Sequence, residues 1–517
     1  MRTQFTIVSL IILAAQGALA YFYPLSAWGF IITAPLFLLG VYEMLQRKRT
    51  LMRNYPLFGR MRYVMEILRP KIYQYFVESD TDGTPISRIY RSLVYQRAKR
   101  QTATTPFGTQ LDVYEPGYEW VNHSMNPLPL EDVKADDLRI TVGGPSCAKP
   151  YSLSILNISA MSYGSLSSTA IEALNWGAKI GGFAHNTGEG SASIFHLKHE
   201  GDLIWQIGTG YFGCRHEDGT FNPQAFAERA NSPSVKMIEI KLSQGAKPGH
   251  GGILPAKKNT PLIAKARGVE PYTTVSSPSN HSSFSDHKGL LNFVAELREL
   301  SGGKPVGFKL CFGNPVDFEN LCKAMVETKI LPDFISIDGG EGGTGAAPLE
   351  FSNSIGMSLR DGLIYATDYL KAYDLKKDIK VLASGKILTG FDIIRAISIG
   401  ADACYSARGM MLSLGCIQAL ECNTNKCPAG VATQNPALYK GLDVADKHYR
   451  VASYHHETVH AVAEMLASMG HKDTLKLNRS SVWRRVSPTI IRSYCELFPD
   501  KNIGSSLLEN APKSTAS

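Results

Sequence analysis

From about residue 150 onward, short apolar segments alternate with segments of helical periodicity, and this alternation limits the fold more than any other feature. Helical spacing of apolar residues predicts helices over 167–180, 290–300 and 390–400. Nearly continuous apolar segments between helices are typical of parallel strands buried on both faces. The strands predicted in this way are 154–159, 236–242, 306–311, 333–338, 379–384 and 402–407. About 300 residues of this pattern favour an α/β fold, a (β/α)8 TIM-type barrel, over an open sheet.

Polar, glycine-rich segments follow the predicted strand ends, at 186–190, 244–252, 336–347 and 383–390. In a barrel these loops gather at one face, where barrel enzymes bind their ligands. Turn chemistry explains the Gly and Asn in them, but not the repeated Lys, Glu and Gln.

Two consecutive loops of this kind favour a phosphate site. The segment 384–386 (SGK) ends one strand, Gly390 begins a helix, and 407–409 (ARG) ends the next strand. Backbone N–H groups at glycines and at helix N-termini bind phosphate. We therefore expect flavin mononucleotide (FMN) or another phosphorylated ligand here.

Three cysteines lie within twelve residues, Cys416, Cys422 and Cys427, and Pro428 follows the last. The chain has 9 cysteines, an odd number that makes a poor disulfide framework. Thiolates bind iron–sulfur clusters, and a proline after the last cysteine is common in such segments. Three ligands suggest a three-iron cluster, with a zinc site or free buried thiols as the alternatives.

The N-terminus contains two uncharged apolar segments, 6–23 and 27–42, followed by QRKR at 46–49. Each approaches the length that crosses a bilayer, and basic residues after the second favour its cytoplasmic placement. We expect a transmembrane helical hairpin in the cell (inner) membrane with the catalytic body facing the cytoplasm. A cleaved signal peptide ending at 18–20 (ALA) is the alternative.

The net charge of +8 is concentrated next to this hairpin. Residues 41–100 carry 13 Lys and Arg against 5 Asp and Glu. This placement argues against nucleic acid as a partner and for a membrane surface. Residues 50–130 are interpreted either as an amphipathic segment on an anionic leaflet or as a collar packed on the catalytic body.

The expected domains are a membrane hairpin (1–46), a basic juxtamembrane region (47–149), the barrel (150–470) with an iron–sulfur segment (415–430), and a C-terminal extension (471–517). Over roughly 150–470 the chain resembles the FMN-binding synthase domain of the glutamate synthase family, in particular short, membrane-anchored relatives. The motifs that carry the resemblance are MSYGSLS (161–167), NTGEG (186–190), IKLSQGAKPGHGG (240–252), GGTGA (342–346) and GCIQALECNTNKCPAGVATQ (415–434).

The resemblance implies an FMN at the barrel mouth, a [3Fe-4S] cluster on the three cysteines, and reduction of 2-iminoglutarate, formed from 2-oxoglutarate and ammonia, to glutamate. It implies that Glu189, Lys247 and Lys309 are catalytic. It assigns the 2-oxo acid to Glu189, Gln244, Lys247 and Arg267. It assigns the flavin to Met161, Ser162, Gln244, Lys309, Gly339, Gly340, Gly343, Gly385, Arg408 and Gly409.

Some features depart from the large glutamate synthases. We expect no glutaminase domain, no long C-terminal domain and no dinucleotide-binding domain. His185 and Asn280 replace residues that the family keeps, which leaves open a membrane-attached flavin oxidoreductase acting on another 2-oxo acid, imine or amino acid. A non-catalytic electron-relay or scaffold protein is the remaining alternative. The expected electron donor is ferredoxin, a dehydrogenase subunit or the quinone pool.

Overall fold

The computed structural model describes residues 1–101 and 104–500, and the chain divides into two compact units, Met1–Arg88 and Ile89 onward. The last 17 residues of the predicted C-terminal extension, 501–517, lie outside the described residues.

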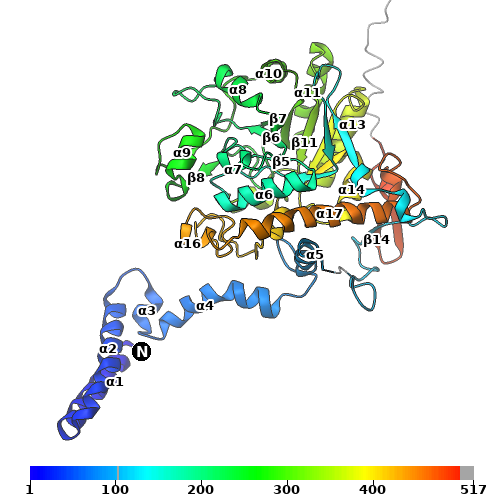
Figure 1. The fold of residues 1–517 in the computed structure, drawn as a ribbon. Helices are drawn as coiled ribbons and strands as arrows, with labels where there is room; N and C mark the ends of the chain where they lie inside the picture. The colour runs from blue at the N-terminus through cyan, green and yellow to red at the C-terminus, as the bar shows by residue number, and fades with distance from the viewer. Residues whose placement is uncertain (102–103, 501–517) are drawn as a thin grey trace, which may run out of the picture. The chain divides into compact units, whose positions relative to one another are not determined.

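The second unit contains a closed barrel of eight parallel strands, which confirms the predicted fold class (Figure 1). In order around the barrel these are β4 (Leu156–Ile158), β5 (His185–Asn186), β6 (Leu203–Ile207), β7 (Val235–Lys241), β10 (Val306–Cys311), β11 (Phe334–Asp338), β12 (Lys380–Ser384) and β13 (Ala403–Ser406). The six strands predicted from the sequence are all present. The sequence did not single out β5 and β6.

Helices follow the strands and surround the barrel (Figure 1). The longer ones are α6 (Ser168–Gly181), α8 (Pro223–Ala230), α10 (His287–Leu300), α11 (Pro315–Thr328), α13 (Leu359–Ala372), α14 (Gly390–Ile399) and α17 (Val444–Ser468). Short helices carry the loops: α7 (Ile194–Leu197), η5 (Ala256–Lys258), α9 (Pro261–Arg267), α12 (Leu349–Ser354), α15 (Arg408–Ser413) and α16 (Pro436–Tyr439). Side-chain caps start α6 and α14, where Ser167 and Thr389 accept from the amides of Ala170 and Asp392.

The interior of the barrel contains one carboxylate that is fully satisfied. Glu239 of β7 accepts hydrogen bonds from Asn186 and Gln206 (each 2.7 Å), Ser336 (2.6 Å) and Tyr405 (3.3 Å). These donors belong to β5, β6, β11 and β13, so one buried charge ties strands on several sides of the barrel together. Below it, the hairpin of β2 (Arg139–Val142) and β3 (Tyr151–Ser154) packs Val142 and Leu153 against the strands' first residues.

A small sheet stands beside the barrel, formed by β1 (Glu119–Val121), β14 (Val482–Ser487) and β15 (Ile490–Ser493) and followed by α18 (Tyr494–Leu497). Glu119 anchors it, pairing with Arg395 of α14 (2.8 Å) and Arg484 of β14 (2.7 Å). The remaining short elements are η3 (Leu130–Asp132), η4 (Ala135–Asp137), β8 (Ile253–Leu254), β9 (Val275–Ser276) and η6 (Arg479–Ser481).

The first unit begins with α1 (Arg2–Phe22), η1 (Pro24–Gly29) and α2 (Phe30–Leu45). The Phe5 ring stacks on Phe37, and Thr33 donates to Gln16 at 2.6 Å, so α1 and α2 pair antiparallel. By length and composition, Arg2–Phe22 and Pro24–Leu45 could each cross a membrane. The unit continues with α3 (Thr50–Asn54), α4 (Gly59–Ile72) and η2 (Tyr73–Val77), and α5 (Arg88–Ala98) leads into the second unit.

Candidate active site

The predicted site residues lie toward the carboxyl ends of the barrel strands, in the loops and short helices that follow them and, for Lys309, in β10 itself. A TIM barrel places its active site at this face. The centre of the site is an ion pair between Glu189, after β5, and Lys241, the last residue of β7. Lys241 Nζ lies 3.0 Å from Glu189 Oε2, and both side chains are largely buried. Burial raises the pKa of Glu189, but Lys241, Arg267 and Lys247 outweigh this effect and hold it below its usual value. Glu189 is therefore a carboxylate enclosed by cations.

Three cations surround this one acid. Lys247 is buried, and its pKa is lowered by burial and by Lys241. Burial lowers the pKa of Arg267 to about 10, which still leaves it charged at neutral pH. Lys241, Lys247 and Arg267 against Glu189 leave a net charge of about +2 in a buried, low-dielectric group. Such a group of charges favours a ligand with two negative charges.

Arg267 ends α9 and is held by neighbouring loops. Its Nη2 donates to the carbonyl oxygen of Tyr163 at 3.2 Å, and its guanidinium lies 4.9 Å from the ring centre of Phe212. Its Nε has no hydrogen-bond partner among the described residues, although Arg267 is only 5% exposed. A buried N–H without an acceptor is costly, so this atom is available to a ligand oxygen.

The backbone of 161–162 packs directly on the NTGEG loop. A Cβ on Gly188 would lie 2.7 Å from the amide nitrogen of Ser162, in contact with backbone that cannot move away easily. Gly188 also has φ +64°, which favours glycine. Met161 and Ser162 thus lie beside Glu189, as the predicted grouping requires.

Lys309 is buried within the same group of strands. Its Cα pairs with that of Lys241 across β10 and β7, and its Nζ lies 3.4 Å from Asp338 Oδ2. That carboxylate oxygen also accepts from the amide of Gly245 at 2.8 Å. Asp338 therefore positions Lys309 and also fixes the loop that carries the half-buried Gln244.

The glycine-rich loops form a cradle beside Lys309. Gly339 donates its amide to the carbonyl of Ser384 at 2.7 Å, and Gly340 donates to Met357. A Cβ on Gly343 would lie 3.2 Å from Nε of Arg408, and Arg408 donates to the carbonyl of Glu341 at 2.6 Å. The loops after β11 and β13 are therefore in contact.

Two cations lie in this cradle, Lys386 and Arg408, with Glu341 near both and Asp338 near Arg408. Burial and the charge of Arg408 lower the pKa of Lys386, and burial lowers that of Arg408. Like charges held together are typical of an anion site. Between them, Gly385 has φ +153°, and a Cβ there would lie 3.4 Å from the amide nitrogen of Gly339. These residues fit the phosphate end of a flavin mononucleotide. Gly409, at the start of α15, packs closely on Tyr454 and Ser406, whose hydroxyls a Cβ at this position would meet.

Cys416, Cys422 and Cys427 lie close enough for each of the first two thiols to have its pKa raised by its neighbours as well as by burial. Within residues 1–101 and 104–500, however, no group of three His, Cys, Asp or Glu side chains converges as metal ligands. The donor set suits a cluster chemically, but its ligand geometry is not formed.

Sequence reasoning missed several members of the site. Lys241 carries the same signal as Lys309, a lysine at the end of a buried strand. His281 supports Lys241: its Nε2 lies 2.9 Å from the carbonyl oxygen of Lys241, and its Nδ1 lies 3.1 Å from the hydroxyl of Tyr211. The hydroxyl of Tyr211 accepts from the amide of Ser283 and donates its own hydrogen to Nδ1. Nε2 of His281 is then the protonated nitrogen and donates to the carbonyl oxygen of Lys241.

The two departures from the family pattern lie away from the cations. His185 is fully buried, with its ring 5.1 Å from that of His196 on α7. Because Asn186 points into the barrel toward Glu239, His185 points outward from the same strand. Asn280 is exposed.

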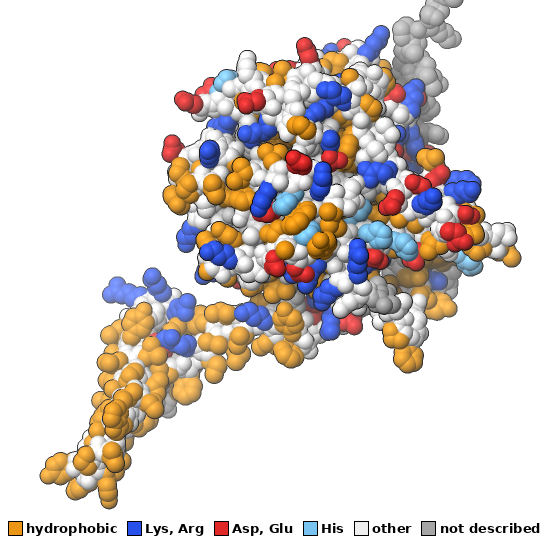
Figure 2. All heavy atoms as spheres, viewed as in Figure 1, with side chains coloured by type: hydrophobic (Ala, Val, Ile, Leu, Met, Phe, Trp, Pro, Cys, Tyr) orange, Lys and Arg blue, Asp and Glu red, His pale blue; other side chains and the backbone are white. Residues whose placement is uncertain are grey.

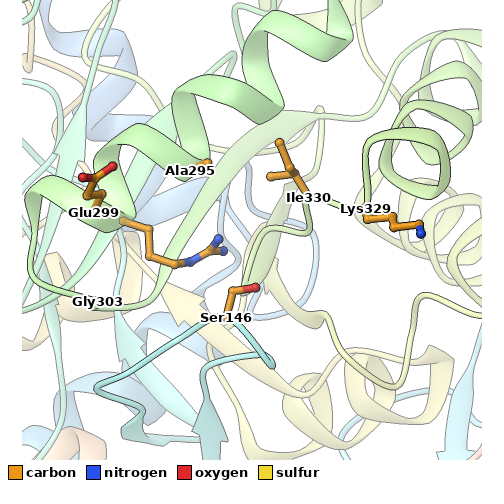
Figure 3. Close-up of a pocket in the computed structure, with 7 residues that line it drawn as sticks. Ser146, Ala295, Glu299, Gly303, Lys329 and Ile330 are labelled. Carbon is orange, nitrogen blue, oxygen red and sulfur yellow. The ribbon is translucent and has the colours of Figure 1, made fainter.

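A separate cavity of about 330 Å³ lies at the opposite end of the barrel (Figure 3). Arg298, which lines it, pairs at 2.9 Å with Asp333, the residue before β11. The cavity is therefore at the amino ends of the strands. Residues at this face of a TIM barrel usually contribute to stability rather than to catalysis.

Comparisons with known proteins identify relatives of this chain. The family described as "Conserved region in glutamate synthase" matches residues 123–472. The chain is 35% identical over 504 residues to "Glutamate synthase large subunit-like protein YerD" of Bacillus subtilis (strain 168), covering 89% of this chain and 95% of that one. It is 32% identical over 326 residues to an "Archaeal-type glutamate synthase" (NADPH) of Thermotoga neapolitana, covering 62% of this chain and 61% of the relative. Among solved structures, a mandelate oxidase with an FMN adduct aligns with a TM-score of 0.42 and 13% identity over 83% of this chain and 99% of that one.

Proposed function

Because this chain belongs to the glutamate synthase family, we propose that it is an oxidoreductase that reduces 2-iminoglutarate, formed from 2-oxoglutarate and ammonia, to glutamate. The observation that carries the proposal is the buried group of Lys241, Lys247 and Arg267 around Glu189. Its net positive charge matches the two carboxylates of a five-carbon 2-oxo acid.

Arg267 and Lys247 are the residues proposed to bind these carboxylates. The guanidinium has an unpartnered Nε–H, considering the described residues, and a fixed position against Phe212, so it can grip a carboxylate in one orientation. Lys247 neutralises the second charge from the adjacent loop. Lys241 is not assigned to a substrate carboxylate, because its ammonium is already paired with Glu189.

Glu189 is proposed to handle the nitrogen. Since its pKa is held low, it is ionised and accepts hydrogen bonds from ammonium or from the iminium N–H. It thereby holds a proton at the imine nitrogen, where positive charge increases the electrophilicity of the carbon. The surrounding burial excludes water that would hydrolyse the imine.

Reduced FMN is the proposed hydride source: when bound, it would supply a hydride to the imine carbon, and the external electron donor would reduce it again. Met161, Ser162, Gln244 and the glycine loops would hold it, with Lys386 and Arg408 at its phosphate. Lys309, fixed by Asp338, would place a positive charge beside the ring system.

Cys416, Cys422 and Cys427 are proposed to bind a [3Fe-4S] cluster, for which their thiols are the suitable donors. Two of the thiols have raised pKa values in the free protein, so binding of iron would release protons. Iron and acid-labile sulfide analysis, with Cys422→Ser as the variant, tests this assignment. Iron content that Cys422→Ser leaves unchanged would refute it.

The hairpin of α1, η1 and α2 is proposed to anchor the protein in the cell (inner) membrane, with the barrel on the cytoplasmic side. The segments 6–23 and 27–42 of these antiparallel helices carry no charge, and Arg47, Lys48 and Arg49 follow them, which supports this orientation. Electrons would come from ferredoxin, a dehydrogenase subunit or the quinone pool. Retention in membranes after carbonate washing, and N-terminal sequencing for cleavage after 18–20, test the anchor.

Glutamate formation tests the function. Detergent-purified protein with bound FMN is supplied with chemically reduced methyl viologen, 2-oxoglutarate and ammonium, and glutamate is measured by mass spectrometry. Formation that requires both substrates supports the proposal. Flavin reoxidation by other 2-oxo acids in preference to 2-oxoglutarate would favour the alternative substrate class, and no turnover with bound FMN would refute the proposal.

A further inference from the structure

Helix α4 presents an apolar face that nothing in its own unit covers. Met61, Val64, Met65, Leu68 and Ile72 follow the spacing i, i+3, i+4, i+7, i+11, so they lie on one side of the helix. Their exposed fractions run from 37% for Leu68 to 59% for Met61. An apolar stripe left this exposed requires a partner.

Basic residues border this stripe on both sides. Arg62, which also pairs with Glu66 at 2.8 Å, and Arg69 lie along one edge. Lys71 lies along the other edge with Arg60, which pairs with Glu43. Long basic side chains at both edges of an apolar face can reach phosphate groups while the apolar residues enter the acyl region. A protein partner that bound the apolar face in a groove would not require basic residues along both of its edges.

The start of α4 is fixed at the end of the apolar hairpin. Glu43, the one acid of α2, is fully buried and accepts from Arg60 at 2.7 Å and from the amide of Leu57 at 2.7 Å. Arg53 also donates to the carbonyl of Met44 at 3.2 Å. These contacts hold α4 level with the last turn of α2, where the apolar segment gives way to basic residues. Figure 2 shows apolar side chains continuing from the hairpin along α4.

From these observations we infer that α4 lies on an anionic lipid surface, with Met61, Val64, Met65, Leu68 and Ile72 in the acyl boundary and Arg62, Arg69 and Lys71 at the lipid phosphates. This inference rests on the proposed membrane hairpin, and it adds a second, electrostatic contact with the same leaflet. Lipid composition would then affect how the N-terminal unit is held, not only whether it is anchored.

Photo-crosslinking in the full-length protein tests this. p-Benzoylphenylalanine is placed at Leu68, at Glu66 on the opposite face, or at Leu38 within α2, and the protein is reconstituted in vesicles containing phosphatidylglycerol. We expect lipid adducts from Leu38 and Leu68 and few from Glu66. Lipid adducts at Leu38 with none at Leu68, or adducts of Leu68 with protein, would overturn this inference alone. No adducts at Leu38 would overturn the hairpin and this inference with it.

A second experiment tests the role of the basic residues. It combines Arg62→Gln, Arg69→Gln and Lys71→Gln in one variant, with the photo-crosslinker at Leu68. In the parent protein we expect a several-fold higher lipid yield in phosphatidylglycerol vesicles than in pure phosphatidylcholine, decreasing with added salt. The triple variant should lose this preference. A preference that persists in the variant would refute the role of these three residues.

Discussion

Lys258 donates a hydrogen bond from Nζ to the carbonyl oxygen of Cys422 at 2.8 Å. The same ammonium donates to Ala432 at 3.0 Å and Ser165 at 3.3 Å, and Lys258 is 3% exposed. It belongs to the loop between Lys247 and Arg267. One side chain therefore joins the candidate substrate loop, the MSYGSLS segment and the cysteine loop.

Lys258→Met should loosen the cysteine loop. The buried carbonyl of Ala432 and the partly buried carbonyls of Cys422 and Ser165 lose their donor, at an expected cost of about 2 kcal/mol in stability. We expect a lower melting temperature and less bound iron per chain. Lys257→Met is the matched control, because the adjacent Lys257 is exposed. Equal iron content and melting temperature in the two variants would contradict this role.

The strands of the barrel could be predicted because buried parallel strands are continuous apolar segments. β5 could not, since it is two polar residues, His185–Asn186, whose places are set by neighbouring strands. Long-range partners were also beyond the sequence: Lys258 meets carbonyls 93 to 174 residues away.

The sequence named residues of the candidate site, but it did not show which of their side chains contact one another. Glu189 and Lys247 lie in motifs of the family, and Arg267 was assigned by position through the resemblance. The partner of Glu189 is Lys241, which in sequence looks like an ordinary strand end. The direction of His185 was also beyond the sequence: strand alternation turns its ring outward, because Asn186 points into the barrel toward Glu239.

Buried histidines should make the protein sensitive to acid. Burial lowers the pKa of His455 to about 3, where its Nε2 contacts Ser154 and the carbonyl of Leu156. Because the folded pKa is below the unfolded value of about 6.5, the unfolded chain binds the proton first. The contribution of the neutral ring to the free energy of unfolding is fully present above about pH 6.5 and is lost as pH falls toward about 3. At pH 5.5 the loss amounts to about 1.4 kcal/mol.

Urea midpoints at pH 7.5 and pH 5.5 measure this effect. The urea midpoint of His455→Gln should decrease less between pH 7.5 and pH 5.5 than that of the parent protein. The exposed neighbour supplies the control, and His456→Gln should decrease as the parent does. An unchanged decrease in His455→Gln would argue against neutral burial of this ring.

Gly385→Ala should reduce FMN binding. With φ +153° and only 3.2 Å between a Cβ and the Cβ of Leu359, the substitution must move the loop that lies against Gly339. Gly345→Ala is the control, since a Cβ there meets nothing within 4 Å and its φ is not positive. FMN released by heat and quantified by fluorescence should fall in the first variant only. Full flavin in Gly385→Ala would remove this loop from the phosphate site.

Lys241→Met should impair catalysis through Glu189. Without this ammonium 3.0 Å away, burial is opposed only by Arg267 and Lys247, so the pKa of Glu189 rises. Because the carboxylate form is the active one, activity is lost as pH falls through that pKa, and the acid limb of the pH–rate profile should shift to higher pH. At pH 7 we expect a decrease in kcat/KM of about 100-fold, equivalent to about 2.7 kcal/mol. Lys236→Met, which removes a more exposed lysine from the other end of β7, should leave both the rate and the profile unchanged. A Lys241→Met enzyme that is slower at every pH without a shifted limb would mean that Lys241 binds substrate directly rather than acting through Glu189.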